Sequence, residues 1–136
     1  MKAYISVSFS KREILDNEIN SIVEIVKKFN IIPFVFVDKY KFQSNQEKEM
    51  MIQAMIDIDD CDILIAETSE KGIGIGIEVG YAKAKEKIVI YIRNINAEHS
   101  TTVSGISDFQ IIYENNDDLQ IKLTKLINKL ELAIKQ

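Results

Sequence analysis

Short apolar stretches alternate along the chain with segments in which apolar residues recur at helical spacing. The stretches are rich in β-branched and aromatic side chains, which is typical of β-strands. One of them, at residues 31–37, is apolar throughout, as buried parallel strands are, and carries Pro33 near its start. We therefore predict five strands, which cover residues 3–9, 31–37, 62–67, 87–92 and 109–113.

The segments between and after these strands predict four helices, each with a recognisable start. Two of them open with a capping box, in which a serine is followed three residues later by a glutamate. An asparagine at the start of the last helix is predicted to cap it. The capping boxes are Ser10 with Glu13 and Ser44 with Glu47, the third helix runs from about Ile77 to Lys85, and Asn116 caps the fourth.

Strands that alternate with helices and are joined by short, right-handed crossovers predict a parallel sheet. We therefore expect the α/β class, with a doubly wound, flavodoxin-like five-stranded parallel sheet and helices on both faces. The length of 136 residues suits one domain, spanning residues 1–136. Ligands of such sheets bind outside the carboxyl ends of the strands. The segments expected there are residues 6–10, 38–42, 67–78 and 93–104.

Composition narrows the range of partners. Apolar residues make up 46% of the chain and charged residues 28%, and the formal net charge is −4 with the basic residues scattered, so we expect no nucleic-acid partner. The single cysteine, Cys61, lies far from the single histidine, His99, so we expect no metal site and a packed, unreactive Cys61. No apolar stretch is long enough to span a membrane and Met1 leads directly into a strand pattern, so we expect a cytoplasmic protein.

The most informative segment for chemistry is residues 67–82, in which glycines alternate with isoleucines before a predicted helix. Gly72, Gly74 and Gly76 allow the backbone to approach a ligand and to present N–H groups at a helix N-terminus, which suits phosphate or sugar oxygens. The segment is neither a P-loop nor a dinucleotide-binding fingerprint, because it lacks the residues that those motifs require. The alternative is a glycine-rich turn that only connects a strand to a helix.

Glu78 follows the glycines and is predicted to lie in the first turn of the helix. The helix dipole and the free N–H groups favour a carboxylate there, so we expect Glu78 to be ionised at neutral pH. An ionised carboxylate at the mouth of a sheet is suited to attack, or to stabilise, an oxocarbenium-like sugar carbon. Alternatively, Glu78 serves only to stabilise the helix.

Tyr4 in the first strand, Asp-Ile-Leu-Ile-Ala-Glu at residues 62–67 and Gly-Ile-Gly-Ile-Glu-Val-Gly-Tyr-Ala at residues 74–82 together resemble the nucleoside 2-deoxyribosyltransferase superfamily. This superfamily includes the 2′-deoxynucleoside 5′-monophosphate N-glycosidases. The resemblance implies that Glu78 attacks C1′ of a deoxyribose while the base leaves, with Tyr4 beside that carboxylate and Ser8 at the 5′ end of the substrate. The substrate-binding loops that it implies contain Ser8, Phe9, Ser10, Gly72, Gly74 and Gly76.

Three positions depart from the pattern of that family. Its monophosphate hydrolases have an arginine where this chain has Ser10 and a serine where this chain has Gly72, which leaves only neutral groups for a phosphate. We therefore expect an unphosphorylated nucleoside rather than a 5′-monophosphate as the substrate. The family's aspartate that protonates the leaving base aligns with Ala54, and Asp57, one turn later, is the nearest catalytic substitute.

A polar loop at residues 98–105 follows the fourth predicted strand. In the family, a serine of this loop binds the phosphate in a neighbouring subunit's site. The resemblance implies the same role for Ser100, Thr101 or Thr102, and with it a homo-oligomer, either a dimer or a larger assembly. His99 is expected to be a solvated residue of this loop.

The sequence thus leaves three functions open. The first is cleavage or exchange of the N-glycosidic bond of a (deoxy)nucleoside or its 5′-monophosphate, with Glu78 as the nucleophile and no cofactor. The second is a nucleotide-binding module of the same fold without catalysis, which Ala54 favours. The third is an NAD hydrolase, because Tyr4-Ile-Ser-Val-Ser also resembles the opening of a TIR domain.

Overall fold

The computed structural model of the chain describes residues 1–135. It contains the five predicted strands, whose ends lie within two residues of the predicted ones. The strands are β1 (Lys2–Val7), β2 (Ile32–Val35), β3 (Ile63–Glu67), β4 (Ile88–Asn94) and β5 (Phe109–Tyr113). The helices are the 3-10 helix η1 (Phe9–Leu15) and the α-helices α1 (Asp16–Lys28), α2 (Phe36–Lys39), α3 (Glu47–Asp59), α4 (Ile73–Ala84), α5 (Thr101–Ile106) and α6 (Asn116–Lys135).

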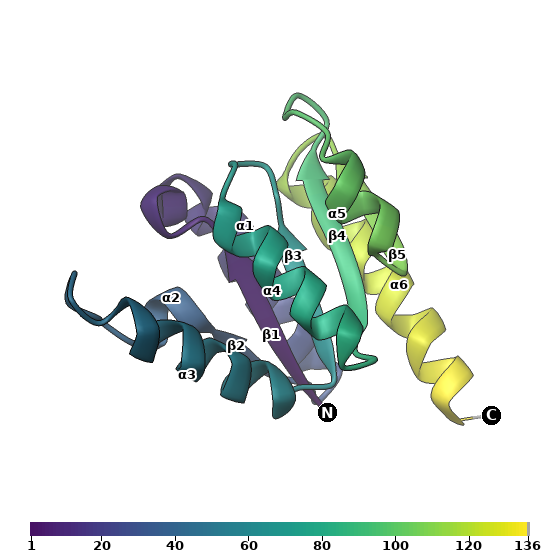
Figure 1. Cartoon of the computed structure of the whole chain (residues 1–136). Helices are drawn as coiled ribbons and strands as arrows, with labels where there is room; N and C mark the ends of the chain where they lie inside the picture. The colour runs from purple at the N-terminus through teal and green to yellow at the C-terminus, as the bar shows by residue number, and fades with distance from the viewer. Residues whose placement is uncertain (136) are drawn as a thin grey trace.

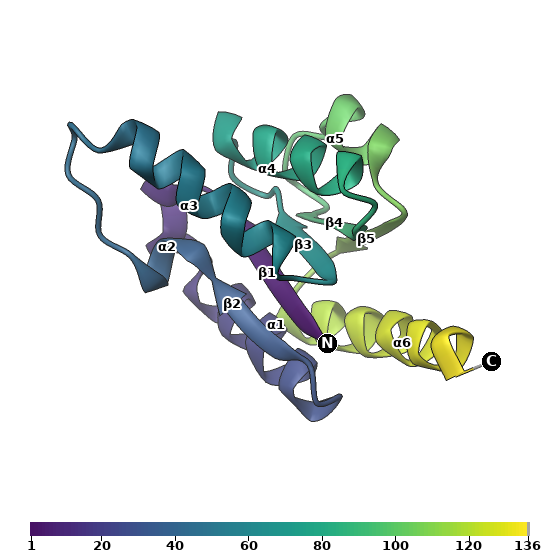
Figure 2. The ribbon, with the colours of Figure 1, turned by 60° about the horizontal axis from the view of Figure 1, so that its bottom comes forward.

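The strands form one parallel sheet in the order β2-β1-β3-β4-β5. Helices α1 and α6 pack together on one face, and α3, α4 and α5 cover the other (Figures 1 and 2). The predicted doubly wound, flavodoxin-like sheet is therefore confirmed. The chain runs outward from β1 to β2 and then returns to β3 on the other side of β1. The carboxyl ends of β1 and β3 consequently flank the point at which this fold binds its ligands.

The alternation of side chains along β1 assigns its residues to two separate cores. Ala3, Ile5 and Val7 join the core under α1 and α6. Tyr4 points the opposite way, into a smaller core under α3 and α4. Ser6 lies on the same side as Tyr4, because it is two residues further along the strand. The sequence of β1 thus places two hydroxyl groups beneath α4.

The predicted start of the first helix is wrong. Ser10 lies within η1, and α1 begins only at Asp16, without a side-chain cap. A long-range contact accounts for the difference, because Arg12 of η1 donates two hydrogen bonds to the Asp38 carboxylate of α2, at 2.8 and 3.0 Å. This bidentate pair fixes η1 against a segment that follows β2. The local capping pattern at Ser10 does not include that constraint.

The second predicted capping box is wrong as well. Helix α3 begins at Glu47, and neither Ser44 nor the preceding Gln46 caps it through a side chain. The Gln46 side chain instead accepts a hydrogen bond from the backbone N–H of Gln43, at 2.7 Å. This turn gives the Gln43 backbone N–H a hydrogen-bond partner in the loop that leads into α3. Ser44 lies within that loop, outside the helix.

The other two helices also begin at different residues from those predicted. Helix α4 begins at Ile73 rather than near Ile77, so that Gly74 and Gly76 are helical. Helix α6 is capped by the residue before the predicted one, since the Asn115 side chain accepts the backbone N–H of Asp118 at 2.8 Å. The longer α4 forms because its buried residues keep helical spacing; they are Ile75, Val79 and Ala82.

The expected burial is wrong for one strand and confirmed for one residue. Strand β2 was expected to be fully buried, but it pairs only with β1 at the edge of the sheet, and its Ile32 side chain is 62% exposed. Cys61 is packed in the core as expected, and burial raises the pKa of its thiol to about 11. Within residues 1–135, no helix combines the length and the apolar character needed to cross a membrane.

A buried carboxyl group fixes the start of the loop between β3 and α4. Glu67, at the end of β3, is fully buried and accepts hydrogen bonds from the Ser69 backbone N–H at 2.6 Å and the Tyr113 hydroxyl at 2.9 Å. The Ser69 hydroxyl lies 3.1 Å from that of Tyr113 and accepts the Asn94 backbone N–H at 2.7 Å. The loop is thus tied to the ends of β4 and β5. Burial raises the pKa of Glu67 to about 7, and the nearby Glu18 carboxylate adds to the rise, while the bonds from Ser69 and Tyr113 oppose it.

We predict that this carboxyl group makes the stability of the protein depend on pH. Between the ordinary glutamate pKa of about 4.3 and about 7, the folded chain keeps the Glu67 proton that the unfolded chain releases. The free energy of unfolding should therefore fall by about 2 kcal/mol from pH 5 to pH 8 through this group. Glu67→Gln should lack that loss, because its neutral amide fits once the Tyr113 hydroxyl turns to accept from it. Urea denaturation of both proteins at the two pH values measures the difference, and parallel pH dependences would contradict the assignment.

Candidate active site

The Glu78 carboxylate is held by two hydroxyl groups of β1. The Tyr4 hydroxyl donates a hydrogen bond to Oε2, and the Ser6 hydroxyl donates one to Oε1 at 3.1 Å. Both donors are buried, with Tyr4 at 0% and Ser6 at 2% exposure, so little water competes for them. The structure thus brings Tyr4 and Glu78 together and adds Ser6, which the sequence analysis did not single out. The alternation of side chains from Tyr4 to Ser6 along the strand could have identified it.

Glu78 lies in the second turn of α4, not in the first turn as predicted, because the helix begins at Ile73. The first-turn position that the sequence analysis expected to favour the carboxylate form is therefore not the one Glu78 occupies. Burial raises the pKa of Glu78 above its ordinary value, and the hydrogen bonds from Tyr4 and Ser6 oppose this rise, because they stabilise the carboxylate. The ionisation of Glu78 consequently depends on the two hydroxyl donors.

A cavity of about 340 Å³ opens beside Glu78 at the carboxyl ends of β1 and β3. Ligand pockets in proteins start at roughly this size. Five of the predicted substrate-binding residues line it, namely Ser8, Phe9, Ser10, Gly72 and Gly74. The remaining walls are mainly apolar and come from β1, α2, α3, α4 and the β3–α4 loop. They consist of Val7, Phe36, Val37, Met50, Met51, Ala54, Lys71 and Ile75.

Gly74 leaves room next to the carboxylate, since a Cβ atom added there would lie 4.0 Å from Oε1 of Glu78. Gly76 does not line the cavity, contrary to the prediction, and a Cβ atom there would meet nothing within 4 Å. Thr101 and Thr102 are exposed in the first turn of α5 and also lie outside this cavity. Their implied role concerned a neighbouring subunit and stays a prediction.

The structure does not bring Asp57 to the cavity. Ala54 is the residue of this part of α3 that lines it, and Asp57 lies one turn further along the helix. The Asp57 carboxylate accepts a hydrogen bond from the Gln53 side chain at 3.0 Å through Oδ1, and its buried Oδ2 has no partner among the described residues. Asp57 therefore does not reach the cavity in which it would have to replace the missing general acid.

An aromatic cluster extends from Tyr4 to the wall of the cavity. The Tyr4 ring lies 5.8 Å from that of Phe34 and 6.0 Å from that of Phe36, measured between ring centroids. Tyr40 and Phe42 continue the cluster, at 5.2 and 6.1 Å from Phe36. Phe36 itself lines the cavity. An aromatic ring in an apolar wall offers a surface on which the planar face of a nucleobase can pack.

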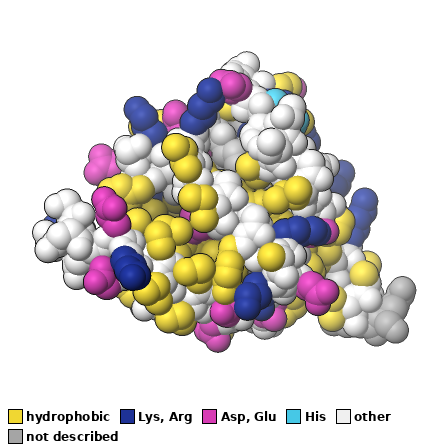
Figure 3. All heavy atoms as spheres, in the orientation of Figure 1, with side chains coloured by type: hydrophobic (Ala, Val, Ile, Leu, Met, Phe, Trp, Pro, Cys, Tyr) yellow, Lys and Arg dark blue, Asp and Glu magenta, His cyan; other side chains and the backbone are white. Residues whose placement is uncertain are grey.

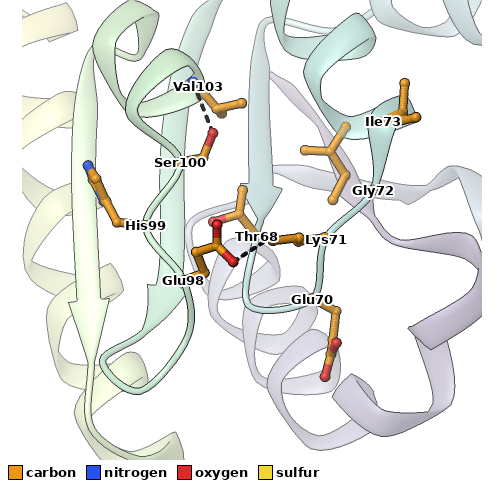
Figure 4. A pocket seen from close by; sticks show the side chains of 10 residues that line it. Thr68, Glu70, Lys71, Gly72, Ile73, Glu98, His99, Ser100 and Val103 are labelled. Atoms are coloured by element: carbon orange, nitrogen blue, oxygen red, sulfur yellow. Dashed lines mark hydrogen bonds and ion pairs between the residues drawn. The ribbon is translucent and has the colours of Figure 1, made fainter.

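Lys71 is a charged residue of this site that the sequence analysis missed. It lines the cavity beside Glu78, where the sequence analysis had considered only neutral groups for a phosphate. Lys71 also lines a second cavity, of about 290 Å³, between the β3–α4 loop and the β4–α5 loop (Figure 4). There its ammonium group forms an ion pair with Glu98 at 2.5 Å. His99 lines the second cavity as well, exposed as predicted and 3.3 Å from the Tyr91 hydroxyl.

The charges around the first cavity are few. Among the described residues that line it, Glu78 carries the one carboxyl group and Lys71 the one positive charge. No three His, Cys, Asp or Glu side chains within residues 1–135 are grouped so that they would hold a metal ion. The arrangement thus offers one carboxylate, oriented by two hydroxyl groups, to a ligand in a largely apolar cavity. Chemically, this suits a nucleophile or a group that stabilises developing positive charge.

No family model matches this chain, and no curated protein matches its sequence. Solved structures do share its fold. A CMP N-glycosidase of Clostridium botulinum is 20% identical, with a TM-score of 0.63 over 90% of this chain and 98% of that one. A 2-deoxyribosyltransferase of Bacillus psychrosaccharolyticus is 13% identical, with a TM-score of 0.68 over 88% of this chain and 90% of that one.

A 3-dehydroquinate dehydratase-like protein of Bifidobacterium longum also shares the fold, with 12% identity and a TM-score of 0.53 over 96% of both chains. At these identities the likeness concerns the fold alone. An N-glycosidase and a deoxyribosyltransferase are thus among the structures that share the flavodoxin-like fold, as expected from the resemblance.

We predict that removal of one hydroxyl donor raises the pKa of Glu78 further. In Tyr4→Phe the aromatic packing is kept, while the hydrogen bond that stabilises the carboxylate is lost. Carbon-13 NMR titration of the glutamate carboxyl groups measures this pKa, and Glu78→Gln assigns the signal. The control is Tyr81→Phe, which removes a hydroxyl of α4 that donates to Asp59 instead. An unchanged or lower pKa of Glu78 in Tyr4→Phe would contradict the described geometry.

Proposed function

We propose that the protein cleaves or exchanges the N-glycosidic bond of a nucleoside or its 5′-monophosphate, with Glu78 as the nucleophile. The observation that carries this proposal is the contact of one buried carboxylate with Tyr4 and Ser6 at the edge of a cavity. The apolar wall that includes Phe36 suits a nucleobase. The shared fold of an N-glycosidase and a deoxyribosyltransferase supports the same class of reaction.

In the proposed reaction, a carboxylate oxygen of Glu78 forms a bond to C1′ of the sugar. The bond between C1′ and the base nitrogen breaks at the same time, and the base leaves with the electron pair and gains a proton. Water then attacks C1′, gives up a proton to the solvent and releases the sugar, or a second base attacks C1′, gives up its N–H proton and yields a new nucleoside. In both cases the bond between C1′ and Glu78 breaks and the carboxylate is restored. Tyr4 and Ser6 hold its two oxygens throughout.

The cavity provides no second carboxyl group for the departing base among its described lining residues, since Ala54 lies where an acid is expected. Water must then supply the proton, and loss of general acid catalysis lowers a rate by roughly 10²- to 10⁴-fold. The proposed enzyme is therefore slow, or is restricted to bases that leave readily. The same observation favours the second candidate, a nucleotide-binding module without catalysis.

We expect Glu78→Gln to abolish base release, because an amide cannot form the bond to C1′. The proteins are incubated with nucleosides, deoxynucleosides, their 5′-monophosphates and NAD, and the free base is quantified by chromatography. The rate should fall by at least about 1,000-fold, as for other nucleophile substitutions. The matched control is Glu24→Gln, which makes the same change on the exposed surface of α1.

The outcomes separate the candidate functions. Base release by Glu78→Gln within a few-fold of the wild-type rate would refute the assigned nucleophile. Binding of a nucleotide without base release by the wild-type protein would identify the non-catalytic module. Release of nicotinamide from NAD alone would identify the activity expected from the likeness to TIR domains.

We also propose that the chain forms a homo-oligomer through the face made by α3 and α4. Four isoleucine side chains on this face are between 46% and 88% exposed, and hydrophobic side chains gather over the two helices (Figure 3). Their spacing of four residues keeps each pair on one side of its helix. Exposed apolar patches of this kind mark contact surfaces. The residues are Ile52 and Ile56 of α3 and Ile73 and Ile77 of α4.

If this face is the interface, charges placed on it should dissociate the assembly. We expect Ile56→Lys combined with Ile77→Lys to give the mass of one chain, 15.6 kDa, by light scattering at micromolar concentration. The control pair, Ile121→Lys with Leu132→Lys, changes two equally exposed side chains of α6 on the other side of the sheet and should keep the wild-type mass. A wild-type mass of 15.6 kDa would refute the proposal.

A further inference from the structure

Lys71 lies between two cavities and lines both of them. Together with Gly72 and Ile75, it lines both the cavity beside Glu78 and the second cavity between the two loops. In the structure, the ammonium group is turned toward Glu98, on the β4–α5 loop (Figure 4). Lys71 thus lines both cavities, while its ammonium group is directed toward Glu98.

The ion pair between Lys71 and Glu98 is weak, so it breaks readily. Both side chains are largely exposed, with Lys71 at 76% and Glu98 at 68%. Pairs of this kind contribute little to stability, because water and salt screen them and both side chains lose conformational freedom. A doubly negative group in the neighbouring cavity would attract the ammonium group more strongly than a single exposed carboxylate does.

Apart from Lys71, the described residues that line the cavity beside Glu78 carry no positive charge. Its hydroxyl groups, from Ser8 and Ser10, are neutral, and Glu78 adds a negative charge. A phosphate bound there without a cation would be repelled by the carboxylate and would have only neutral donors. Among the described lining residues, Lys71 is the cation available to it.

We propose that Lys71 turns from Glu98 into the Glu78 cavity and makes it select nucleoside 5′-monophosphates over nucleosides. This inference rests on the proposed function and names its substrate class. Glu98 is then a competitor for the same ammonium group and lowers the selectivity. The expected preference is opposite to the one drawn from the neutral residues Ser10 and Gly72, because Lys71 supplies the charge that these positions lack.

The test compares kcat/KM for a 5′-monophosphate with kcat/KM for the nucleoside of the same base. Lys71→Met keeps the length of the side chain and should lower this ratio about 10-fold, the contribution of a charged hydrogen-bond donor. Glu98→Gln frees the lysine and should raise the ratio about two- to fivefold. Lys129→Met on α6, on the opposite face of the sheet, changes the net charge equally and should leave the ratio within about twofold.

Calorimetric binding of the same two compounds to Glu78→Gln provides a second readout, which does not need turnover. If the wild-type protein releases no base, the proposed function fails, and the ratio of the two dissociation constants still decides the role of Lys71. The inference is overturned by a ratio that Lys71→Met leaves within twofold of wild type. It is also overturned if Lys129→Met lowers the ratio equally, or if Glu98→Gln lowers it.

Discussion

The geometry of the candidate site depends on a carboxyl group that is largely removed from water and placed against two hydroxyl donors. Removal from water disfavours the charged form of Glu78, and the hydrogen bonds from Tyr4 and Ser6 favour it. Both donors come from one face of β1, so the strand must keep its register in the sheet for either to reach the carboxylate. Helix α4 must in turn cross directly above that face. The pairing of β1 with β3, the placement of α4 and the charge of Glu78 are therefore parts of one constraint.

The sequence predicted the sheet correctly because its strands are short apolar stretches whose burial determines their structure. It also located Glu78, because that residue lies in a distinctive local pattern of glycines. Ser6 and Lys71 were missed for different reasons. Ser6 was detectable, since it shares a strand face with Tyr4. The place of Lys71 depends on how the β3–α4 loop is folded, and contacts from Ser69 to distant strand ends fix that loop. No local pattern reports such contacts.

The helix starts show the same division between local and long-range effects. The serine and glutamate pair at Ser10 favours an α-helix start there, yet this segment is a 3-10 helix, which the bonds from Arg12 to Asp38 tie to α2. In the glycine segment, low helix propensity suggested a loop. Burial of Ile75 and Val79 against the sheet provides enough apolar contact to make the segment helical in spite of its glycines. Packing therefore overrides propensity at the place where the candidate nucleophile is positioned.

The β3–α4 loop has a fixed start and an exposed charged side chain near its end. Its start is fixed by Glu67, which is buried and bonded to the Ser69 backbone, so the path of the chain toward α4 is well defined. Lys71, near the end of the loop, has an exposed side chain held by a single surface ion pair. The carboxylate of Glu78 is positioned by β1 and not by this loop. The proposed role of Lys71 in binding a 5′ phosphate can therefore be changed at position 71, while the two hydroxyl donors keep the Glu78 carboxylate in place.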